Sequence, residues 1–485
     1  MRATLIGLDF GTTTSHALIA SARAVRNCVT GRRAWGDVEV IYRSEPVFTP
    51  IEHGRIDERR LSAYLDEWLA HIPAGSRDEI SGGAIVTGLA AQRANAGAIR
   101  GLVQERLGDA VIAVMNDPCL ESWVSFMGSC LRLSRAHPDS DFLHLDIGGG
   151  TTNLAYARNG EVLATGCLFV GARHFRVRPG TWELAEISHQ GQTLLAHLGI
   201  SRKPGESLQP DEIAAIVRWY VATLEAAVNG AMPGDPCTAA HIQVPLRIPV
   251  DQPELYRRRL AGQRPAVQAP IITFSGGVGE LIYAQAAGKV SHATTPYGDL
   301  GLELAAAIRA SPRLSANLTT HVPAHGGRAT LYGMTLYSCE VSGATLYLPR
   351  PDVLPLRDLP IVARLDPTAD DTECRRAVGL AASCGGPVCI QIIRPLGALS
   401  ALQTFCARLR RELERAAFPA DRALAILLPD NAGKTFGNLL SDWGRSPRCL
   451  VVIDEVPARA ARFVNIGALK DQLVSISYFG MEAEL

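Results

Sequence analysis

Two apolar segments, residues 5–8 and 142–145, each end at an aspartate that is followed by glycine and then by hydroxyl side chains. Short apolar runs of this kind, bounded by turn residues, are typical of buried strands. Glycine lets a ligand approach the main chain without a Cβ clash, and successive N–H groups in such a turn form an anion-binding concavity. Each segment therefore predicts a strand that leads into a phosphate-holding turn. A plain glycine-rich turn between two strands is the alternative for either segment alone.

A third segment of this type covers residues 271–279. An apolar run leads into Ser275, Gly276 and Gly277 and then into a predicted helix, where the glycines would let a flat adenine lie against the backbone. The aspartates of the first two segments, Asp9 and Asp146, are 146 − 9 = 137 residues apart, which is too far for one loop. Together the three segments predict a duplicated domain whose halves face each other across a nucleotide cleft.

The remaining pattern predicts an α/β protein. In the first part of the chain, apolar residues recur at helical spacing over residues 55–70, and short apolar strands alternate with helices up to residue 133. Such alternation favours a mostly parallel sheet with helices on its faces. From about residue 312 the pattern changes to a further series of strands and helices. We therefore expect a first half over residues 1–140, a second half with a helical insertion over 141–315, and a C-terminal α/β domain over 316–485.

The charge balance, the length of the apolar runs and the cysteine pattern exclude several classes of protein and partner. The 48 basic and 48 acidic residues balance, so no basic field is present to steer nucleic acid or an anionic membrane. No apolar run approaches the roughly 18 residues that a spanning helix needs. The chain runs from Met1 straight into the first predicted strand, so we expect no signal peptide. The 11 cysteines contain no C-x-x-C pair, and we expect reduced thiols in a cytoplasmic protein.

The C-terminal domain contains a partial imitation of a P-loop. Gly433, Lys434 and Thr435 follow a predicted strand, and Asp454 stands at an acidic strand end. The first P-loop glycine would fall at position 428, which is a leucine, so the loop lacks the backbone freedom to wrap a phosphate. We therefore expect Lys434 to be a solvated residue at the start of a helix.

The three glycine motifs resemble those of the actin, sugar-kinase and heat-shock-chaperone ATPase superfamily. Residues 9–13 are similar to its first phosphate motif, residues 146–151 to its second, and residues 275–279 to its adenosine motif. Residues 115–118 resemble the start of the first connecting helix, with Asp117 where the chaperones carry glutamate; locally, Asn116 or Asp117 can cap this helix. The stretch from Gly298 to Arg309 resembles the second connecting helix. The resemblance implies duplicated actin-like, ribonuclease H-like, ATPase halves.

The same resemblance implies ATP and Mg²⁺ as cofactors and assigns roles residue by residue. Asp9 and Asp146 would hold the metal, and the implied catalytic residues are Asp9, Asp117, Asp146 and Thr151. The implied nucleotide-binding residues lie in the three glycine motifs: Gly11, Thr12, Thr13, Gly148, Gly149, Gly150, Thr152, Ser275, Gly276 and Gly277. For each threonine, ordinary turn chemistry at a strand end is the alternative.

Within the superfamily, the chain resembles the reactivating factors of ethanolamine ammonia-lyase along essentially its whole length. The resemblance rests on residues 7–14, 85–96, 144–153, 430–434 and 452–467. It departs at Leu89, where that family usually carries glutamate. It implies an ATPase that binds the inactivated, cobalamin-dependent lyase and opens it so that damaged cobalamin leaves. It leaves open self-association and association with the ethanolamine-utilisation microcompartment.

Other members of the superfamily fit less well. Sugar kinases need a general base and a polar sugar pocket, and nothing in the sequence marks either. The chaperones carry a β-rich domain after the ATPase, whereas the C-terminal part of this chain has an α/β pattern. Activators of radical dehydratases carry paired cysteines for an iron–sulfur cluster, and this sequence lacks such a pair. A small-molecule kinase of the same fold remains the alternative function, and a nucleotide-binding scaffold without turnover is a third.

Overall fold

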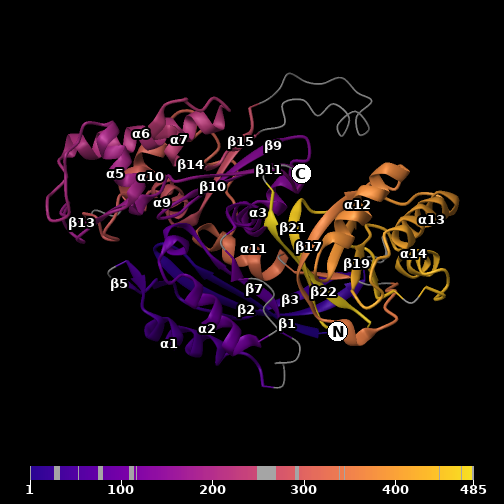
Figure 1. Cartoon of the computed structure of the whole chain (residues 1–485). Coiled ribbons are helices and arrows are strands. Elements are labelled where there is room, and N and C mark those ends of the chain that lie inside the picture. Colours follow the sequence, from indigo (N-terminus) through magenta and orange to yellow (C-terminus); the bar gives the residue numbers. More distant parts are fainter. Residues whose placement is uncertain are drawn as a thin grey trace.

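Three sheets of five or more strands, each accompanied by helices, form the framework of the protein (Figure 1). The computed structural model describes residues 2–26, 33–52, 54–74, 80–108, 114–115, 117–247, 269–289, 294–337, 339–342, 345–446, 448–470 and 472–482. The predicted α/β class is confirmed. No helix in these ranges is long and apolar enough to cross a membrane.

The first sheet has the order β3-β2-β1-β7-β8, with β4 paired to β2 at its side. Strands β1, β2 and β3 are antiparallel neighbours, whereas β7 and β8 run parallel to β1. Apolar side chains of β1 pack against Leu61, Leu65 and Trp68 of α1 and against α2. The elements are β1 (Arg2–Phe10), β2 (Thr14–Arg26), β3 (Arg33–Arg43), β4 (Val47–Phe48), β7 (Ile80–Val86), β8 (Val114–Met115), α1 (Glu58–Leu69) and α2 (Gly97–Leu107).

The second sheet repeats this plan in the order β14-β11-β10-β9-β15. Its central strand β9 ends at Ile147, has an antiparallel hairpin on one side, and has the parallel strand β15 on the other. The strands are β9 (Asp141–Ile147), β10 (Thr152–Arg158), β11 (Glu161–Leu168), β14 (Ile242–Val244) and β15 (Ile271–Ser275). Since β1 and β9 hold equivalent positions, the predicted duplication of the two halves is confirmed. We call the two halves the first and second lobes.

Helices from the insertion and from the end of the second lobe build its large core. Tyr220 of α6, Phe274 of β15 and Phe175 of β12 are fully buried in this core. Residues 248–265 of the expected insertion lie outside the described residues. The elements are β12 (Phe175–Val177), β13 (Leu184–Ile187), α5 (His189–His197), α6 (Pro210–Val228), α7 (Pro236–His241), α9 (Gly276–Ala286) and α10 (Gly301–Ala310).

Helices α3 (Pro118–Ser129) and α11 (Ala329–Tyr337) cross at the centre of the molecule (Figure 1). Helix α3 follows the first lobe in sequence but packs on β9, β10 and β11 of the second; α11 follows the second lobe but packs on β1, β2 and β7 of the first. The crossing is tight, because a Cβ at Gly333 would overlap the Val124 carbonyl oxygen, and one at Gly128 would overlap the Ala329 carbonyl oxygen. The helix that follows each lobe in sequence therefore packs on the other lobe.

This exchange corrects one expectation. The stretch from Gly298 to Arg309 was expected to form the second connecting helix, but α10 packs against α9 and α6 inside the second lobe. The helix that crosses α3 is α11 instead. Helix α11 also lies beyond the expected domain boundary at residue 315 and packs on the first lobe. The boundaries themselves stay a prediction.

The C-terminal segment forms a seven-stranded sheet in the order β16-β22-β21-β17-β18-β19-β20. Strands β17 to β20 are parallel, and β21, β22 and β16 continue the sheet antiparallel. Helices α12, α13 and α14 lie on its far side from the two lobes (Figure 1). The elements are β16 (Glu340–Ser342), β17 (Leu356–Leu365), β18 (Val388–Ile392), β19 (Leu424–Leu427), β20 (Leu450–Ile453), β21 (Ala461–Ile466), β22 (Val474–Met481), α12 (Asp371–Ser383), α13 (Leu399–Arg415) and α14 (Gly433–Leu440).

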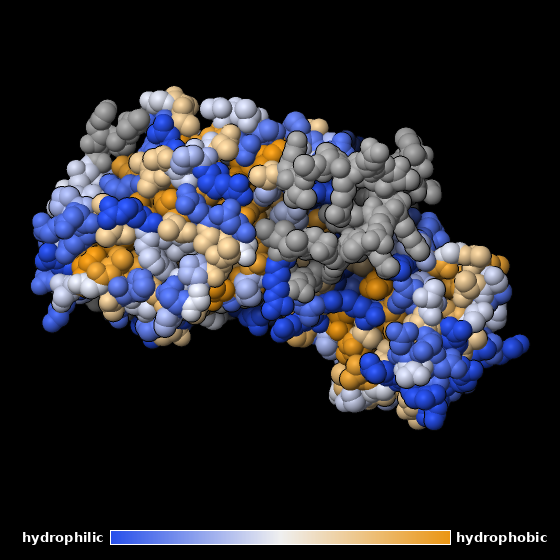
Figure 2. Space-filling model, turned by 90° about the horizontal axis from the view of Figure 1, so that it is seen from above, coloured by the Kyte–Doolittle hydropathy of each residue, from blue (hydrophilic) through white to orange (hydrophobic). Residues whose placement is uncertain are grey.

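On the face shown in Figure 2, hydrophilic and hydrophobic residues are interspersed in small groups.

The remaining elements are short. The short elements are β5 (Ile51–Glu52), β6 (Arg55–Ile56), α4 (Leu131–Ala136), and the 3₁₀ helices η2 (Gly88–Gln92), η4 (Ala172–His174), η5 (Gly326–Arg328) and η6 (Pro351–Val353).

The tight crossing gives a stability prediction. Gly333→Ala should lower the free energy of unfolding by about 1–3 kcal/mol, because the added methyl forces α3 and α11 apart. Gly101→Ala is the matched control: it also lies within a helix, and no atom lies within 4 Å of its added Cβ. That control should be neutral or stabilising by up to about 1 kcal/mol, because alanine favours the helix. Equal effects of the two substitutions in denaturant unfolding would contradict the close crossing.

Candidate functional site

Asp9 and Asp146 stand near the ends of the two central strands, and both side chains are buried. The Asp9 Oδ2 atom lies 3.1 Å from His16 Nε2, and its Oδ1 atom is buried without a hydrogen-bond partner among the described residues. Asp146 accepts hydrogen bonds from Ser275 Oγ at 2.5 Å and from Thr330 Oγ1 at 3.1 Å. Burial raises the pKa of Asp146 to about 6, against the hydrogen bonds from Ser275 and Thr330, which lower it. Thr330 belongs to α11, so the crossing helix helps to fix the carboxylate.

The two predicted phosphate loops have the same internal turn. The Gly11 N–H donates to the Thr14 carbonyl at 2.9 Å, and the Gly148 N–H donates to the Thr151 carbonyl at 2.9 Å. Loop 1, residues 11–13, is further held by Thr49, whose hydroxyl donates to the Gly11 carbonyl at 2.7 Å. The structure therefore reproduces in each lobe the turn that the motifs predicted.

These loops touch each other. A Cβ at Gly149 would overlap the Thr13 hydroxyl, and one at Gly150 would lie 2.9 Å from Thr12 Oγ1 and 2.7 Å from Leu89 Cγ. The Leu89 N–H donates to Thr12 Oγ1 at 2.8 Å, so Leu89, which stands where glutamate was expected, sits against both loops. A side chain at position 149 or 150 would force one of these neighbours to shift. The two loops are therefore in contact in this structure.

The remaining loop residues have different surroundings. Thr151 is buried beside Gly88 of η2, with its Oγ1 atom 3.5 Å from where a Cβ of that glycine would lie. Thr152 is fully buried and its hydroxyl donates to the Val170 carbonyl at 2.7 Å. Its role in nucleotide binding stays a prediction, which this contact does not favour.

The predicted adenosine motif opens α9 beside Asp146. Asp146 Oδ1 would lie 2.9 Å from a Cβ at Gly276, whereas a Cβ at Gly277 would have no atom of the described residues within 4 Å. The backbone at Gly277 is thus accessible to a flat ligand. The Ser275 hydroxyl donates its proton to Asp146 and is therefore not available as a donor to a ligand at Gly277.

A buried histidine supports this serine from behind. His144 Nε2 lies 2.7 Å from Ser275 Oγ, and His144 Nδ1 lies 3.0 Å from Thr273 Oγ1. Because Ser275 donates to Asp146, His144 must donate from Nε2 and accept at Nδ1. Burial lowers the pKa of His144 to about 3, which keeps the ring neutral. The chain Thr273, His144, Ser275, Asp146 therefore fixes the direction of each hydrogen bond up to the carboxylate.

Glu121 is a third carboxyl group at this point, and the motifs did not identify it. It lies on α3 and is buried. Burial, then the charges of Asp146 and Asp9, raise the pKa of Glu121 well above its usual range, against the hydrogen bonds from Asn153 and Thr87. The sequence does contain a signal for this residue. Glu121 follows Asp117 by four residues, one helical turn, in the helix that Asp117 and Pro118 begin.

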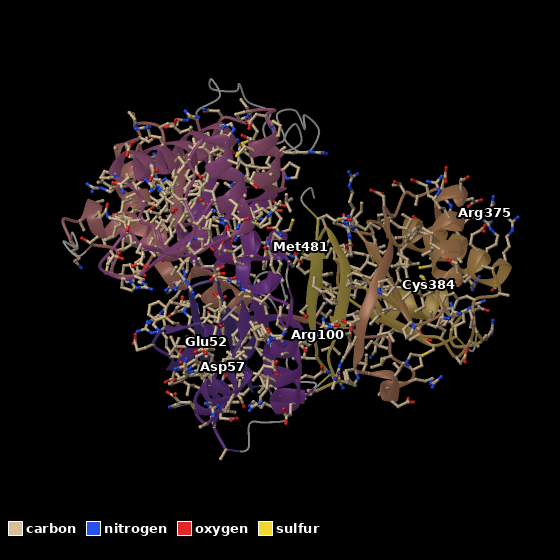
Figure 3. All side chains as sticks on the ribbon, turned by 60° about the vertical axis from the view of Figure 1, so that its left-hand side comes forward. Glu52, Asp57, Arg100, Arg375, Cys384 and Met481 are labelled. Carbon is tan, nitrogen blue, oxygen red and sulfur yellow. The ribbon has the colours of Figure 1, made fainter. Side chains whose placement is uncertain are left out.

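Asp117, one of the four predicted catalytic residues, is held by backbone N–H groups. It is the N-cap of α3, with Oδ1 accepting from Leu120 N at 3.0 Å and Oδ2 accepting from Met481 N at 2.8 Å. Figure 3 shows Met481 where β22 meets the two lobes. Burial raises the pKa of Asp117. These contacts favour a role in joining α3 to the C-terminal sheet, and its catalytic role stays a prediction. Asn116, the other candidate cap, lies outside the described residues.

The donor set fits ATP with Mg²⁺. Magnesium prefers oxygen ligands and is usually bound by one or two carboxylates together with phosphate oxygens and waters. Asp9 offers a buried carboxylate oxygen that has no hydrogen-bond partner in the described part of the chain, and Asp146 and Glu121 add two carboxyl groups to the same region. A divalent cation would relieve the repulsion among these three groups.

A cavity of about 520 Å³ continues from loop 1 between the lobes. Two contacts cross it: Arg93 Nη1 of the segment after η2 lies 3.1 Å from Glu186 Oε1 of β13, and the Arg173 guanidinium lies 5.6 Å from the Phe48 ring centroid. Both contacts join one lobe to the other, so they must change if the loops separate.

In the C-terminal sheet, the loop that imitates a P-loop is hydrogen-bonded to the protein's own Asp454. Asp454 is fully buried and accepts hydrogen bonds from Gly433 N and Thr345 N, each at 3.1 Å, and from the Thr345 hydroxyl. With its oxygens engaged in this way, Asp454 ties a loop to the start of α14. This agrees with the expectation that Lys434 does not bind nucleotide, which stays a prediction.

Comparisons with known proteins give one family. The model of the ethanolamine utilisation protein EutA matches residues 2–472. The chain is 29% identical over 495 residues to the ethanolamine ammonia-lyase reactivase EutA of Escherichia coli (strain K12), covering 95% of this chain and 94% of that protein. It is 27% identical over 492 residues to the protein of the same description from Salmonella typhimurium, with the same coverage.

Solved structures resemble the chain more distantly. One is a Ppx/GppA family member from Aquifex aeolicus, with a TM-score of 0.34 and 13% identity over 69% of this chain and 88% of that one. Another is the ethanolamine utilization protein EutJ from Carboxydothermus hydrogenoformans, with a TM-score of 0.28 and 16% identity over 69% of this chain and 89% of that one.

The carboxyl cluster gives a testable expectation. Glu121→Gln should raise the free energy of unfolding of the metal-free protein at pH 8, because glutamine keeps the shape and removes a buried acid that burial and like charges disfavour when it ionises. Glu414→Gln, at an exposed position of α13, is the control and should stay within about 0.5 kcal/mol. Denaturant unfolding measures both. Destabilisation by Glu121→Gln would contradict this expectation, because it would mean that hydrogen bonds accepted by the ionised carboxylate stabilise the fold.

Proposed function

The chain belongs to the family of the ethanolamine utilisation protein EutA, and from this membership we propose that it is an ATP-dependent reactivating factor of ethanolamine ammonia-lyase. The lyase uses adenosylcobalamin and becomes inactive when the cofactor loses its adenosyl group and the damaged cobalamin stays bound. The proposed role is to bind the inactive lyase in the cytoplasm and to open it, so that damaged cobalamin leaves and fresh cofactor enters.

The observation that carries the proposal is the pair of phosphate loops facing each other over buried carboxylates. Asp9 and Asp146 are the proposed magnesium ligands, and Thr12, Thr13 and Thr151 are the proposed hydroxyl donors to phosphate. Gly149 and Gly150 would supply backbone N–H groups, and Gly148, whose N–H donates to the Thr151 carbonyl, would shape the phosphate turn. Gly276 and Gly277 would supply the face for adenosine. When bound, Mg²⁺ would neutralise phosphate charge during phosphoryl transfer.

The protein's own residues explain how nucleotide would control shape. The loops are in contact here, and we infer that phosphates bound between them would move the lobes apart. Because α3 and α11 each pack on the other lobe, that movement changes their crossing. Asp117 then passes a shift of α3 to β22 through Met481. Nucleotide state would thus bias the position of the C-terminal sheet, which we propose as the part that acts on the lyase.

One assay tests this function. Ethanolamine ammonia-lyase blocked with cyanocobalamin should regain activity with the full chain, ATP, Mg²⁺ and fresh adenosylcobalamin, and should not regain it without ATP. Asp146→Asn should lower both ATP hydrolysis and reactivation by at least about a hundredfold, because it removes a preorganised charge from the phosphate site. Lys434→Ala should change neither.

Three outcomes separate the alternatives. Reactivation without ATP would contradict the mechanism, and failure of the full chain with its cognate lyase would contradict the function. A phosphorylated small molecule formed from ATP, without any effect on the lyase, would instead identify a kinase.

Asp117 gives a second prediction, which distinguishes coupling from catalysis. Asp117→Asn places an amide N–H₂ or a single acceptor where two backbone N–H groups now find carboxylate oxygens. The loss of a hydrogen bond to a charged group costs about 1.5–3 kcal/mol, so reactivation should fall at least about tenfold while ATP hydrolysis is kept. If both rates fall in parallel, Asp117 acts in hydrolysis, as the sequence resemblance implied.

A further inference from the structure

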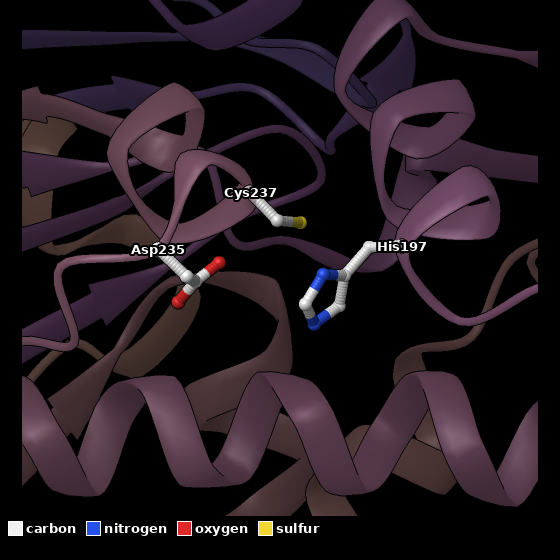
Figure 4. Close-up of side chains that lie close together, drawn as sticks. All are labelled: His197, Asp235 and Cys237. Atoms are coloured by element: carbon white, nitrogen blue, oxygen red, sulfur yellow. The ribbon is translucent and has the colours of Figure 1, made fainter.

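Three side chains of the second lobe converge at a place outside the nucleotide cleft. They are His197 at the end of α5, Asp235 just before α7, and Cys237 in the first turn of α7. One potential ligand atom of each lies within 4.8 Å of those of the other two. In Figure 4 the Cys237 sulfur and the Asp235 carboxylate both face the space beside the His197 ring. The cluster therefore joins two helices that are separate in sequence.

Two of the three side chains are held in place by their own helix. Asp235 is the N-cap of α7, with Oδ1 accepting from Thr238 N at 3.0 Å and Oδ2 accepting from Thr238 Oγ1 at 2.6 Å. Each carboxylate oxygen keeps a further lone pair. Behind Cys237, His241 Nδ1 donates to the Cys237 carbonyl at 2.8 Å and lies 3.9 Å from its sulfur. These bonds fix the turn that presents the sulfur and the carboxylate on the same side.

The chemistry of the set selects the ion. A thiolate, an imidazole and a carboxylate are the ligand types that Zn²⁺ takes in proteins, whereas Mg²⁺ and Ca²⁺ prefer oxygen alone. His197 is exposed, Asp235 is half-buried and Cys237 is buried, so an ion can enter from solvent. Three protein ligands leave a fourth position for water.

We propose that His197, Asp235 and Cys237 form a Zn²⁺ site that fastens the end of α5 to the start of α7. Burial, and then the charge of Asp235, raise the pKa of the Cys237 thiol to about 11, so ion binding would displace a proton from the sulfur. The site lies on the insertion of the second lobe and does not depend on the proposed reactivation of the lyase.

The test is a metal titration of the full chain after treatment with a chelator. One equivalent of Zn²⁺ per chain should bind in competition with a chromophoric chelator, and excess Mg²⁺ should not displace it. Co²⁺ in the same site should give a sulfur-to-cobalt charge-transfer absorption. Cys237→Ser, His197→Ala and Asp235→Asn should each weaken Zn²⁺ binding by at least about tenfold.

The controls keep the result interpretable. His189→Ala removes an exposed histidine from the other end of the same helix and should leave Zn²⁺ binding unchanged. Because His197 is exposed, His197→Ala tests the site even if Cys237→Ser fails to fold. ATP hydrolysis should be unaffected by His197→Ala, which separates this site from the nucleotide cleft. Absence of stoichiometric binding, binding retained in His197→Ala and Asp235→Asn, or a cobalt spectrum without the sulfur band would overturn the proposal.

Discussion

The close crossing of α3 and α11 is the contact on which the candidate site depends. It requires the missing side chains of Gly128 and Gly333, since a Cβ at either position would overlap a carbonyl oxygen of the other helix. Because each helix packs on the lobe that it does not follow in sequence, the crossing brings Glu121 of α3 and Thr330 of α11 to the carboxylates of β1 and β9. A rotation of one lobe cannot occur without a change at this crossing.

The site concentrates negative charge in a buried place. Asp9, Asp146 and Glu121 lie together, and burial and like charges raise the pKa values of Asp146 and Glu121. Such a group of acids is costly unless protons or a cation neutralise it. The hydrogen-bond chain through His144 and Ser275 orients Asp146 for this purpose, and it is built from fully buried residues. The electrostatics thus favour a bound cation, which a metal–nucleotide complex would supply.

The sequence predicted the parts of the site that are local. Each phosphate loop is a strand, an aspartate and a glycine turn within a few residues, and the structure repeats the turn in both lobes. The rest depends on tertiary packing. Glu121 and Thr330 join the site only through the packing of α3 and α11, and His144 meets Ser275 only because β9 pairs with β15. Asp117 gains its second backbone partner from Met481, 364 residues away in sequence. The expected second connecting helix was wrong for the same reason: α10 and α11 are both short helices in sequence, and only their packing separates them.

In the proposed function, nucleotide separates the loops and so changes the angle between the lobes. Spin labels at Arg59 of α1 and Gln192 of α5, two exposed positions on opposite lobes, allow the distance across the cleft to be measured by pulsed electron paramagnetic resonance. We expect one distance distribution without nucleotide and a distribution at longer distances with a non-hydrolysable ATP analogue and Mg²⁺. The Asp146→Asn variant should keep the nucleotide-free distribution. An identical distribution with and without the analogue, under conditions where binding is shown to be saturated, would contradict it.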